Sequence, residues 1–249
     1  MDPTWFQLNW CYFGLAAAVV LAVLLFATDL CRQRAGVSRW RDPVWLSWLM
    51  VLAYLIHNFE EYGIDATGTR YGFPKMLCNM FGYVLADCPA PSNFFVFVNI
   101  PAIWVGAVAA ALLARRSHAV GLGYLGLLIV NTLTHLGPVL AGRSGYDSGL
   151  LTAVVLFIPL SAWIIHVCFG HGGLRYQTLA AILLAGVLLH VVLIGSIQLL
   201  MHGVLSGTVV NLIQVLNPLS LFVLPWAASK IWPAQSGTPV VAGERRSER

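Results

Sequence analysis

The stretch Ile56-His57-Asn58-Phe59-Glu60-Glu61-Tyr62 decides the fold, because it places three ionisable side chains at the end of an apolar run that begins at Val44. At helical pitch, Glu60 and Glu61 follow His57 by one turn, so both carboxylates flank the imidazole on one face of a helix. A charged group within a membrane helix costs roughly 2.5 to 3.5 kcal/mol and normally faces a bundle interior or a cavity. The stretch therefore predicts a polar site inside an apolar protein.

The composition of the whole chain is that of an integral membrane protein. Hydrophobic residues make up 59% of the 249 positions and charged residues only 10%, against about 25% charged in soluble domains. No Gly/Ser/Pro linker or repeat divides the chain, so we expect one transmembrane domain over residues 1–233 and a polar, disordered cytoplasmic tail over 234–249. The formal charge of +4 comes from basic residues dispersed among short loops, which argues against a nucleic-acid partner.

Hydropathy predicts the architecture, an all-α bundle of about seven transmembrane helices in the cell membrane. A crossing needs about 20 apolar residues. On that measure the predicted spans are residues 5–27, 44–61, 93–114, 119–141, 149–169, 176–201 and 208–230. The last two spans come from one uncharged stretch, which is too long for a single crossing. His202-Gly203 and Ser206-Gly207 are expected to form a tight turn that divides it.

The basic residues predict the orientation of these spans. Of the 14 Lys and Arg residues, only Arg70, Lys75 and Arg143 fall on one side of the predicted membrane, which leaves eleven for the other. Because cytoplasmic loops collect Lys and Arg, the amino terminus is predicted to lie outside and the carboxy terminus in the cytoplasm.

The long outer loop, residues 62–92, carries two features of interest. Cys78 and Cys88 both lie in it, on the oxidising side of the membrane, so a disulfide between them is a fair hypothesis. The loop is also rich in aromatic residues, and we considered both a lid over the polar site and a plain connecting loop.

A second polar stretch, Asn131-Thr132-Leu133-Thr134-His135, reaches the same depth as the first. Asn131 and His135 are one helical turn apart and share a face. At about 1.5 Å rise per residue, His57 lies roughly 20 Å and His135 roughly 24 Å from the cytoplasmic ends of their spans. Two motifs far apart in the sequence are thus predicted to meet in the outer half of the bilayer.

Other polar residues lie at similar depths within the predicted spans. They are Asn99, His190, Gln198, Asn211 and Gln214. Taken singly, Asn99, Gln198, Asn211 and Gln214 are more often interhelical hydrogen-bond partners than functional groups. The four-residue set of His57, Glu60, Glu61 and His135 is better explained by function, because carboxylates are an expensive way to hold helices together.

Three kinds of chemistry fit that four-residue set. Imidazoles and carboxylates on facing helices can hold zinc or non-haem iron, although neither the His-Glu-x-x-His pattern nor the Glu-x-x-His pair of di-iron bundles is present. A carboxylic acid held protonated by burial beside an imidazole could instead protonate a lipophilic substrate without any cofactor. Buried His and Glu also occur in proton-coupled transporters, but no internal repeat supports that alternative.

The motifs together resemble the HXXEE-domain family of polytopic membrane proteins. His57-Asn58-Phe59-Glu60-Glu61 matches the defining motif, and Asn131-x-x-x-His135 matches the second. Arg143-x-x-Tyr146-x-x-Gly149-x-x-Thr152, with Pro159 beyond it, is similar to the third, except that Ser148 replaces the family's proline and puts the tight geometry of that loop in doubt. The likeness covers about residues 45–165. It implies a polytopic protein of enzyme type but names no reaction. Small membrane-bound terpenoid cyclases offer only an analogy of architecture, since their Asn-x-x-Trp-Glu pattern is missing here.

From the sequence we therefore expect a membrane-embedded enzyme that acts on a terpenoid- or lipid-like small molecule by proton-initiated cyclisation or isomerisation. Glu60 or Glu61 is the expected acid, His57 orients or recycles it, and Asn131 with His135 completes the catalytic set. The expected substrate-binding residues are Arg143, Tyr146, Asn99, His190 and Asn211. No cofactor is expected in this mechanism; the alternative is a hydrolase or oxygenase with zinc or iron on His57, Glu60, Glu61 and His135. The sequence does not predict an oligomeric state.

Overall fold

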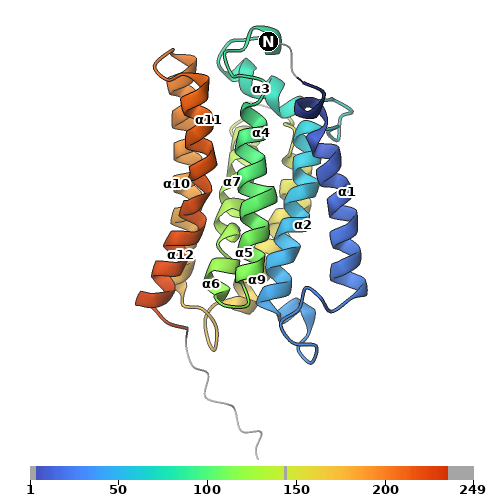
Figure 1. Cartoon of the computed structure of the whole chain (residues 1–249), viewed down its shortest axis with the longest axis vertical. Helices are drawn as coiled ribbons and strands as arrows, with labels where there is room; N and C mark the ends of the chain where they lie inside the picture. The colour runs from blue at the N-terminus through green and yellow to red at the C-terminus, as the bar shows by residue number, and fades with distance from the viewer. Residues whose placement is uncertain (1–3, 143–144, 235–249) are drawn as a thin grey trace, which may run out of the picture.

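The computed structural model describes residues 4–142 and 145–234, and their architecture is a bundle of long helices that run along one axis (Figure 1). Six helical rods are long and apolar enough to cross a membrane. They are α1 (Trp5–Ala27), α4–η3–α5 (Phe94–Leu113), α6–α7 (His118–Leu140), α8–η4–α9 (Leu150–Cys168), α10 (Tyr176–Met201) and α11–η5–α12 (Gly207–Ile231). The all-α prediction is confirmed, with no named strand in the described ranges.

Several of these rods are built from shorter elements. Their bounds are α4 (Phe94–Asn99), η3 (Ile100–Ala107), α5 (Val108–Leu113), α6 (His118–Gly121), α7 (Tyr124–Leu140), α8 (Leu150–Thr152), η4 (Ala153–Phe157), α9 (Ile158–Cys168), α11 (Gly207–Leu216), η5 (Asn217–Leu219) and α12 (Ser220–Ile231). The segments η3 and η4 are π-helical. Each has a proline nearby, Pro101 and Pro159, whose missing N–H favours such a break in the ladder.

A further long helix, α2 (Pro43–Tyr62), is not among the six because its last turns carry the polar motif. Fifteen of its 20 residues are buried. It packs against α1, α5, α7 and α9, so it occupies the centre of the bundle. A central helix can carry carboxylates because its neighbours, and not lipid, surround them. Every predicted span coincides with a helical rod to within one residue at each end.

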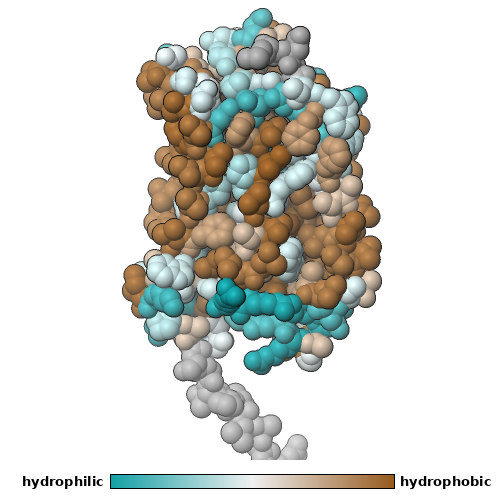
Figure 2. Space-filling view, in the orientation of Figure 1, coloured by the Kyte–Doolittle hydropathy of each residue, from teal (hydrophilic) through white to brown (hydrophobic). Residues whose placement is uncertain are grey.

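The outer surface of the bundle is apolar between two polar ends. On the face shown in Figure 2, mostly hydrophobic residues cover the middle of the molecule and hydrophilic residues gather at both ends. Large apolar side chains are exposed on the helical rods, among them Val105, Leu133 and Val191 at 60–62%. An apolar surface of this extent would aggregate in water and is typical of a surface that faces lipid.

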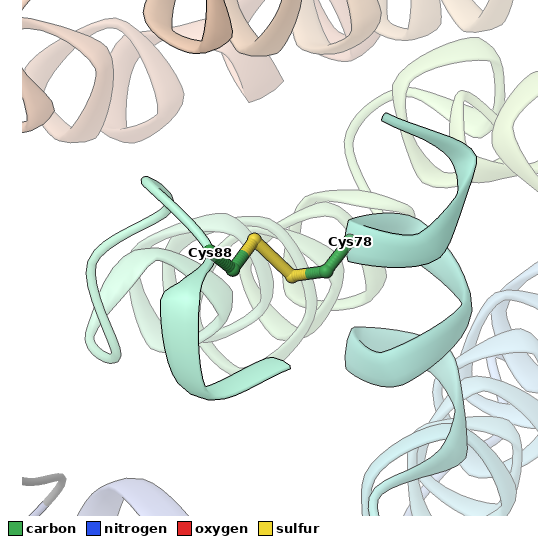
Figure 3. The surroundings of a disulfide bond; sticks show 2 residues. All are labelled: Cys78 and Cys88. Carbon is green, nitrogen blue, oxygen red and sulfur yellow. A yellow bond between two sulfur atoms is a disulfide. The ribbon is translucent and has the colours of Figure 1, made fainter. Parts of the chain in front are cut away.

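The loop after α2 folds over one end of the bundle. It contains α3 (Gly72–Met80) and a short 3-10 turn, η2 (Leu85–Asp87). A disulfide joins Cys78 of α3 to Cys88, which directly follows η2 (Figure 3). The Cα atoms of the two cysteines are 5.7 Å apart, within the usual range for a disulfide. The hypothesis of a Cys78–Cys88 bond is therefore confirmed.

Two glycines bring α7 and α10 into backbone contact. A Cβ atom on Gly126 would lie 1.9 Å from the carbonyl oxygen of Ile182, and one on Gly186 would lie 2.3 Å from the carbonyl oxygen of Gly126. Small residues permit such close approach between membrane helices. The contact fixes the part of α7 that leads to His135 against the part of α10 that leads to His190.

We expect Gly126→Ala to force α7 and α10 apart and to destabilise the protein by about 1–3 kcal/mol, the range for overpacked interiors. The measurement is the thermal unfolding midpoint in detergent. Gly195→Ala on α10 is the matched control, because a Cβ atom there meets nothing within 4 Å and alanine favours the helix. Equal midpoints for the two variants would contradict the close-contact explanation.

Candidate metal centre

The carboxylate of Glu61 lies between two histidines at the outer end of α2. Its Oε1 atom is 3.5 Å from Nε2 of His57, one turn earlier on the same helix, and 3.4 Å from Nε2 of His135 on α7. The exposed fraction of each of the three residues is 4% or less. One ligand atom from each lies within 4.8 Å of the others. The predicted meeting of the two motifs is thus found in the structure.

The other ring nitrogen of each histidine has a partner of its own. Nδ1 of His135 is 2.8 Å from Oδ1 of Asp147, and Nδ1 of His57 is 2.8 Å from the hydroxyl of Thr152. Thr152 in turn donates its hydroxyl proton to Glu60 at 2.5 Å. Each imidazole is therefore held by a carboxylate, directly for His135 and through a hydroxyl for His57. Outer partners of this kind orient the histidine ligands of metal sites.

These partners assign the tautomers of both rings. An ionised carboxylate only accepts hydrogen bonds, so Asp147 requires the proton of His135 on Nδ1. Because Thr152 gives its only proton to Glu60, its oxygen accepts from Nδ1 of His57. In the neutral form of each ring, Nε2 then carries a lone pair. Both Nε2 atoms are buried without a hydrogen-bond partner, and both face the same carboxylate oxygen.

Three acceptor atoms facing one another require a positive charge between them or protons on the rings. A cation would serve all three at once. Zinc binds nitrogen and carboxylate oxygen at about 2.0–2.2 Å, so two ligand atoms of a tetrahedral site stand about 3.3 Å apart. The two distances from Nε2 to the Glu61 oxygen, 3.4 and 3.5 Å, are close to that value. With all three ligand atoms within 4.8 Å of one another, the donor set and the two distances from histidine to carboxylate therefore fit a divalent metal ion.

Glu60 points away from this cluster and binds the start of the helix that begins at Leu150. Its carboxylate accepts hydrogen bonds from the backbone N–H groups of Leu151 and Thr152, at 3.1 and 2.8 Å, and from the hydroxyls of Thr152 and Tyr146, both at 2.5 Å. The first N–H groups of a helix have no partner within it, and negative charge is favoured there. Glu60 thus acts as a cap supplied by a neighbouring helix.

Two loops meet beside Glu60 and are tied together. The Tyr146 hydroxyl also accepts from the backbone N–H of Ala66, and burial, followed by the hydrogen bond to Glu60, raises its pKa. Ser148 donates its hydroxyl proton to Asp65 at 2.6 Å. The serine that stands in place of the family's proline therefore adds a bond between the loops, and the local geometry is kept tight by hydrogen bonding.

Gly149 supplies the space in which the two imidazoles meet. Its φ angle is +108°, a conformation that L side chains rarely adopt, and a Cβ atom would lie 2.6 Å from Cε1 of His135 and 2.8 Å from Cε1 of His57. Only glycine fits this position. The glycine of the third motif is thus explained by the backbone turn that starts α8 and by the closeness of both rings.

A cavity of about 480 Å³ borders the cluster. Glu61, His135 and Asp147 are among the residues that line it, and α3, α4, η3, α7 and α10 supply most of its walls. Most of the wall is apolar or aromatic, including Phe73 on α3, whose ring centroid is 6.2 Å from that of His135. The loop helix α3 therefore covers the site, which is the lid arrangement considered from the sequence.

Comparison with known proteins agrees with the motifs. Residues 48–164 match the model of a family described as "Protein of unknown function with HXXEE motif". This segment is an HXXEE domain. Neither curated proteins nor solved structures give a match to the chain. The cluster, the Glu60 cap and Gly149 all lie within the HXXEE domain, whereas α10 and its contribution to the cavity lie outside it.

The remaining predicted site residues are placed differently. Asn131 and His190 line the cavity that borders the cluster of His57, Glu61 and His135. Asn99 also borders it, but its amide is bonded to Asn58 and Tyr62 and so links α2 to α4. Asn211 bonds Asn93 and is not among the residues that line the cavity. Arg143 lies outside the described residues.

Two residues of the HXXEE domain were missed by sequence reasoning. Asp147 was not considered, and Thr152 was noted only as part of a motif. Both lie at or after a loop whose path a hydropathy pattern does not reveal. The available signal was the requirement that each imidazole of a metal site have an outer partner, which would have directed attention to the Asp147 that follows Tyr146.

Asp65 should make the loop at this end of the bundle sensitive to acid. Burial opposes its ionisation, but hydrogen bonds from Ser148, Thr67 and Thr69 lower its pKa below 3.8. A lowered pKa contributes stability that is present above the unfolded value and is lost as pH falls through the folded value. We expect wild-type protein to become more susceptible to proteolysis between residues 63 and 71 below about pH 4.

Asp65→Asn is the comparison variant for this loop. It should show greater proteolysis at pH 7 and little further change on acidification, because the titrating group is gone. The measurement is the rate of cleavage by pepsin at acid pH and by a neutral protease at pH 7. Each rate is divided by the rate at which the same enzyme cleaves an unstructured peptide at the same pH. A wild-type rate that does not change with pH would contradict the assigned role of Asp65.

Proposed function

We propose that the protein is a metal-dependent membrane enzyme whose ion, zinc in the favoured case, is held by His57, His135 and Glu61. The observation that carries the proposal is the pair of buried, unpartnered Nε2 atoms that face one carboxylate oxygen. Two imidazoles and one carboxylate are a common ligand set of catalytic zinc and of non-haem iron. The reaction we favour is hydrolysis within a lipophilic substrate.

A bound zinc ion in this position would polarise a carbonyl or phosphoryl group and lower the pKa of water. The residues of the chain supply the rest. Asp147 and Thr152 fix the ring orientations, Glu60 holds Thr152, and Gly149 leaves room at the cluster. The apolar walls of the cavity exclude bulk water, which strengthens electrostatic interactions at the reacting group.

The membrane arrangement is part of the same proposal. With α2 added to the six candidate spans, we expect the chain to cross the membrane seven times. Because seven is odd, the start of α1 and the end of α12 would then lie on opposite sides of the membrane. Arg32, Arg115 and Arg175 lie in loops at the end of the bundle opposite α3, where Arg115 bonds the carbonyls of Leu30 and Arg32. We assign this basic end to the cytoplasm and the cluster to the outer half of the bilayer.

Metal content is the direct test. We expect about one zinc or iron ion per wild-type chain and none in Glu61→Gln or His135→Ala, measured by elemental analysis of protein purified in detergent and after reloading. His166→Ala is the matched control, since this histidine of α9 is exposed and lies outside the cluster. Wild-type protein that binds neither ion at saturating concentration would overturn the proposal.

Glu60 and Glu61 should behave differently in that assay, although they are adjacent. We expect Glu60→Gln to keep a bound ion with an affinity reduced about 10–100-fold, the usual effect of changing an outer partner of a ligand. The readout is competition with a chelator of known affinity. Complete loss in Glu60→Gln with retention in Glu61→Gln would reverse the two assigned roles.

Gly149→Ala tests the space at the cluster. The added methyl group would collide with both rings and strain the backbone, so we expect metal binding to be lost. The measurement is the same competition assay, together with the unfolding midpoint to separate a local from a global effect. A variant with wild-type affinity would show that the two histidines do not meet as described.

The aromatic walls of the cavity favour a second candidate function, metal-free acid catalysis of cyclisation or isomerisation. Tyr54, Tyr62, Phe73, Phe94 and Phe95 all line the cavity, and aromatic faces stabilise cations. In this reading Glu61 is the acid and the histidines hold and return its proton. The metal assay separates the two candidates.

A further inference from the structure

The cavity reaches the surface of the bundle between α7 and α10. Four of the residues that line it are also exposed: Thr134 on α7, Ile194 and Gln198 on α10, and Met80 at the end of α3. The exposed fractions are 45% for Ile194 and 70% for Met80. Thr134, Ile194, Gln198 and Met80 together form the rim of an opening, which we call the portal.

The portal lies on the side of the bundle and within its membrane-spanning part. Thr134 belongs to the span that ends at Leu140, and Ile194 and Gln198 belong to the span that ends at Met201. Neighbouring side chains are apolar and exposed, with Leu133 at 62%, Val191 at 60% and Leu199 at 44%. A molecule dissolved in the bilayer would meet this surface without leaving the membrane.

The inside of the cavity suits one amphipathic molecule. Its volume of about 480 Å³ is typical of sites for single small ligands, about 300–1,000 Å³, and is too small for a phospholipid with two chains. The wall is apolar, but Asn131 and His190 contribute hydrogen-bonding groups next to Glu61 and His135. A polar group at one end of the ligand would lie at the cluster and an apolar chain along α4 and α10.

We propose that the substrate is a single-chain amphiphile that enters sideways from the leaflet at the α3 end, through the portal between α7 and α10. The inference rests on the proposed function only in calling this molecule a substrate. Thr134 and Gln198 offer hydrogen bonds to the polar group as it passes the rim, and this group then moves inward to the cluster ahead of the apolar chain. The disulfide between Cys78 and Cys88 ties down the α3 segment that forms the upper edge of the portal.

Photo-crosslinking in a bilayer tests the portal. The protein is placed in phosphatidylcholine nanodiscs that contain a small fraction of a diazirine-bearing fatty acid, irradiated, digested and mapped by mass spectrometry. We expect labels on cavity residues such as Leu189, Leu193 and Phe95, besides labels on the outer surface. A phosphatidylcholine with diazirines on both chains should label the outer surface alone.

Two tryptophan variants on α10 provide the matched comparison. Ile194→Trp narrows the portal and should reduce labelling of the cavity residues at least five-fold. Val191 is also exposed, at 60% against 45% for Ile194, but it does not line the cavity, so Val191→Trp should leave that labelling unchanged. Thr134→Trp, on the opposite rim, replaces Ile194→Trp if the latter fails to fold. Wild-type labels confined to the outer surface, or equal labelling in both variants, would overturn the proposal.

Metal content measured on the same samples keeps the two proposals separate. Blocked labelling in Ile194→Trp with no bound metal in any sample would support the portal and overturn the metal site. Bound metal with no labels inside the cavity would support the metal site and overturn the portal.

Discussion

The carboxylate of Glu60 holds together the two helices on which the site depends. It comes from the end of α2 and satisfies N–H groups at the start of the rod that begins at Leu150. In an apolar surrounding, unpartnered N–H groups at a helix start are costly, so this contact fixes the relative position of the two helix ends. Thr152 and Gly149 are brought beside His57 as a consequence.

The neighbouring Glu61 differs from Glu60, because no backbone N–H or hydroxyl group donates a hydrogen bond to its carboxylate among the described residues. Each histidine uses its Nδ1–H to bond another partner, Thr152 or Asp147. The Nε2 atom of each ring then faces Oε1 of Glu61 without a hydrogen-bond partner. Adjacent glutamates thus take different roles because they lie about 100° apart around α2. One direction leads to a helix start and the other to the cavity. A cation between the three acceptor atoms, or protons on the two rings, would satisfy them.

Several sequence predictions hold for physical reasons that are local. Apolar runs of spanning length form helices wherever they occur, which is why the predicted ends differ from the observed ones by at most one residue. That His57 and His135 lie at one depth followed from the predicted common direction of their two spans and from the rise per residue. Asn211 shows the limit of this reasoning, because depth does not tell which way a side chain points around its helix. It faces Asn93 and not the cavity.

The sequence by itself determined that the chain is a bundle of helices long and apolar enough to cross a membrane, with His57, Glu60, Glu61 and His135 at one level, since hydropathy and helical pitch are properties of neighbouring residues. Only the tertiary structure decided which glutamate serves which purpose, and it revealed Asp147 and Thr152 as partners of the histidines. Those assignments depend on a loop, residues 145–149, that returns to α2 from another helix. Its path is set by a positive-φ glycine and by hydrogen bonds to Glu60 and Asp65, which are long-range contacts that no periodicity in the sequence encodes.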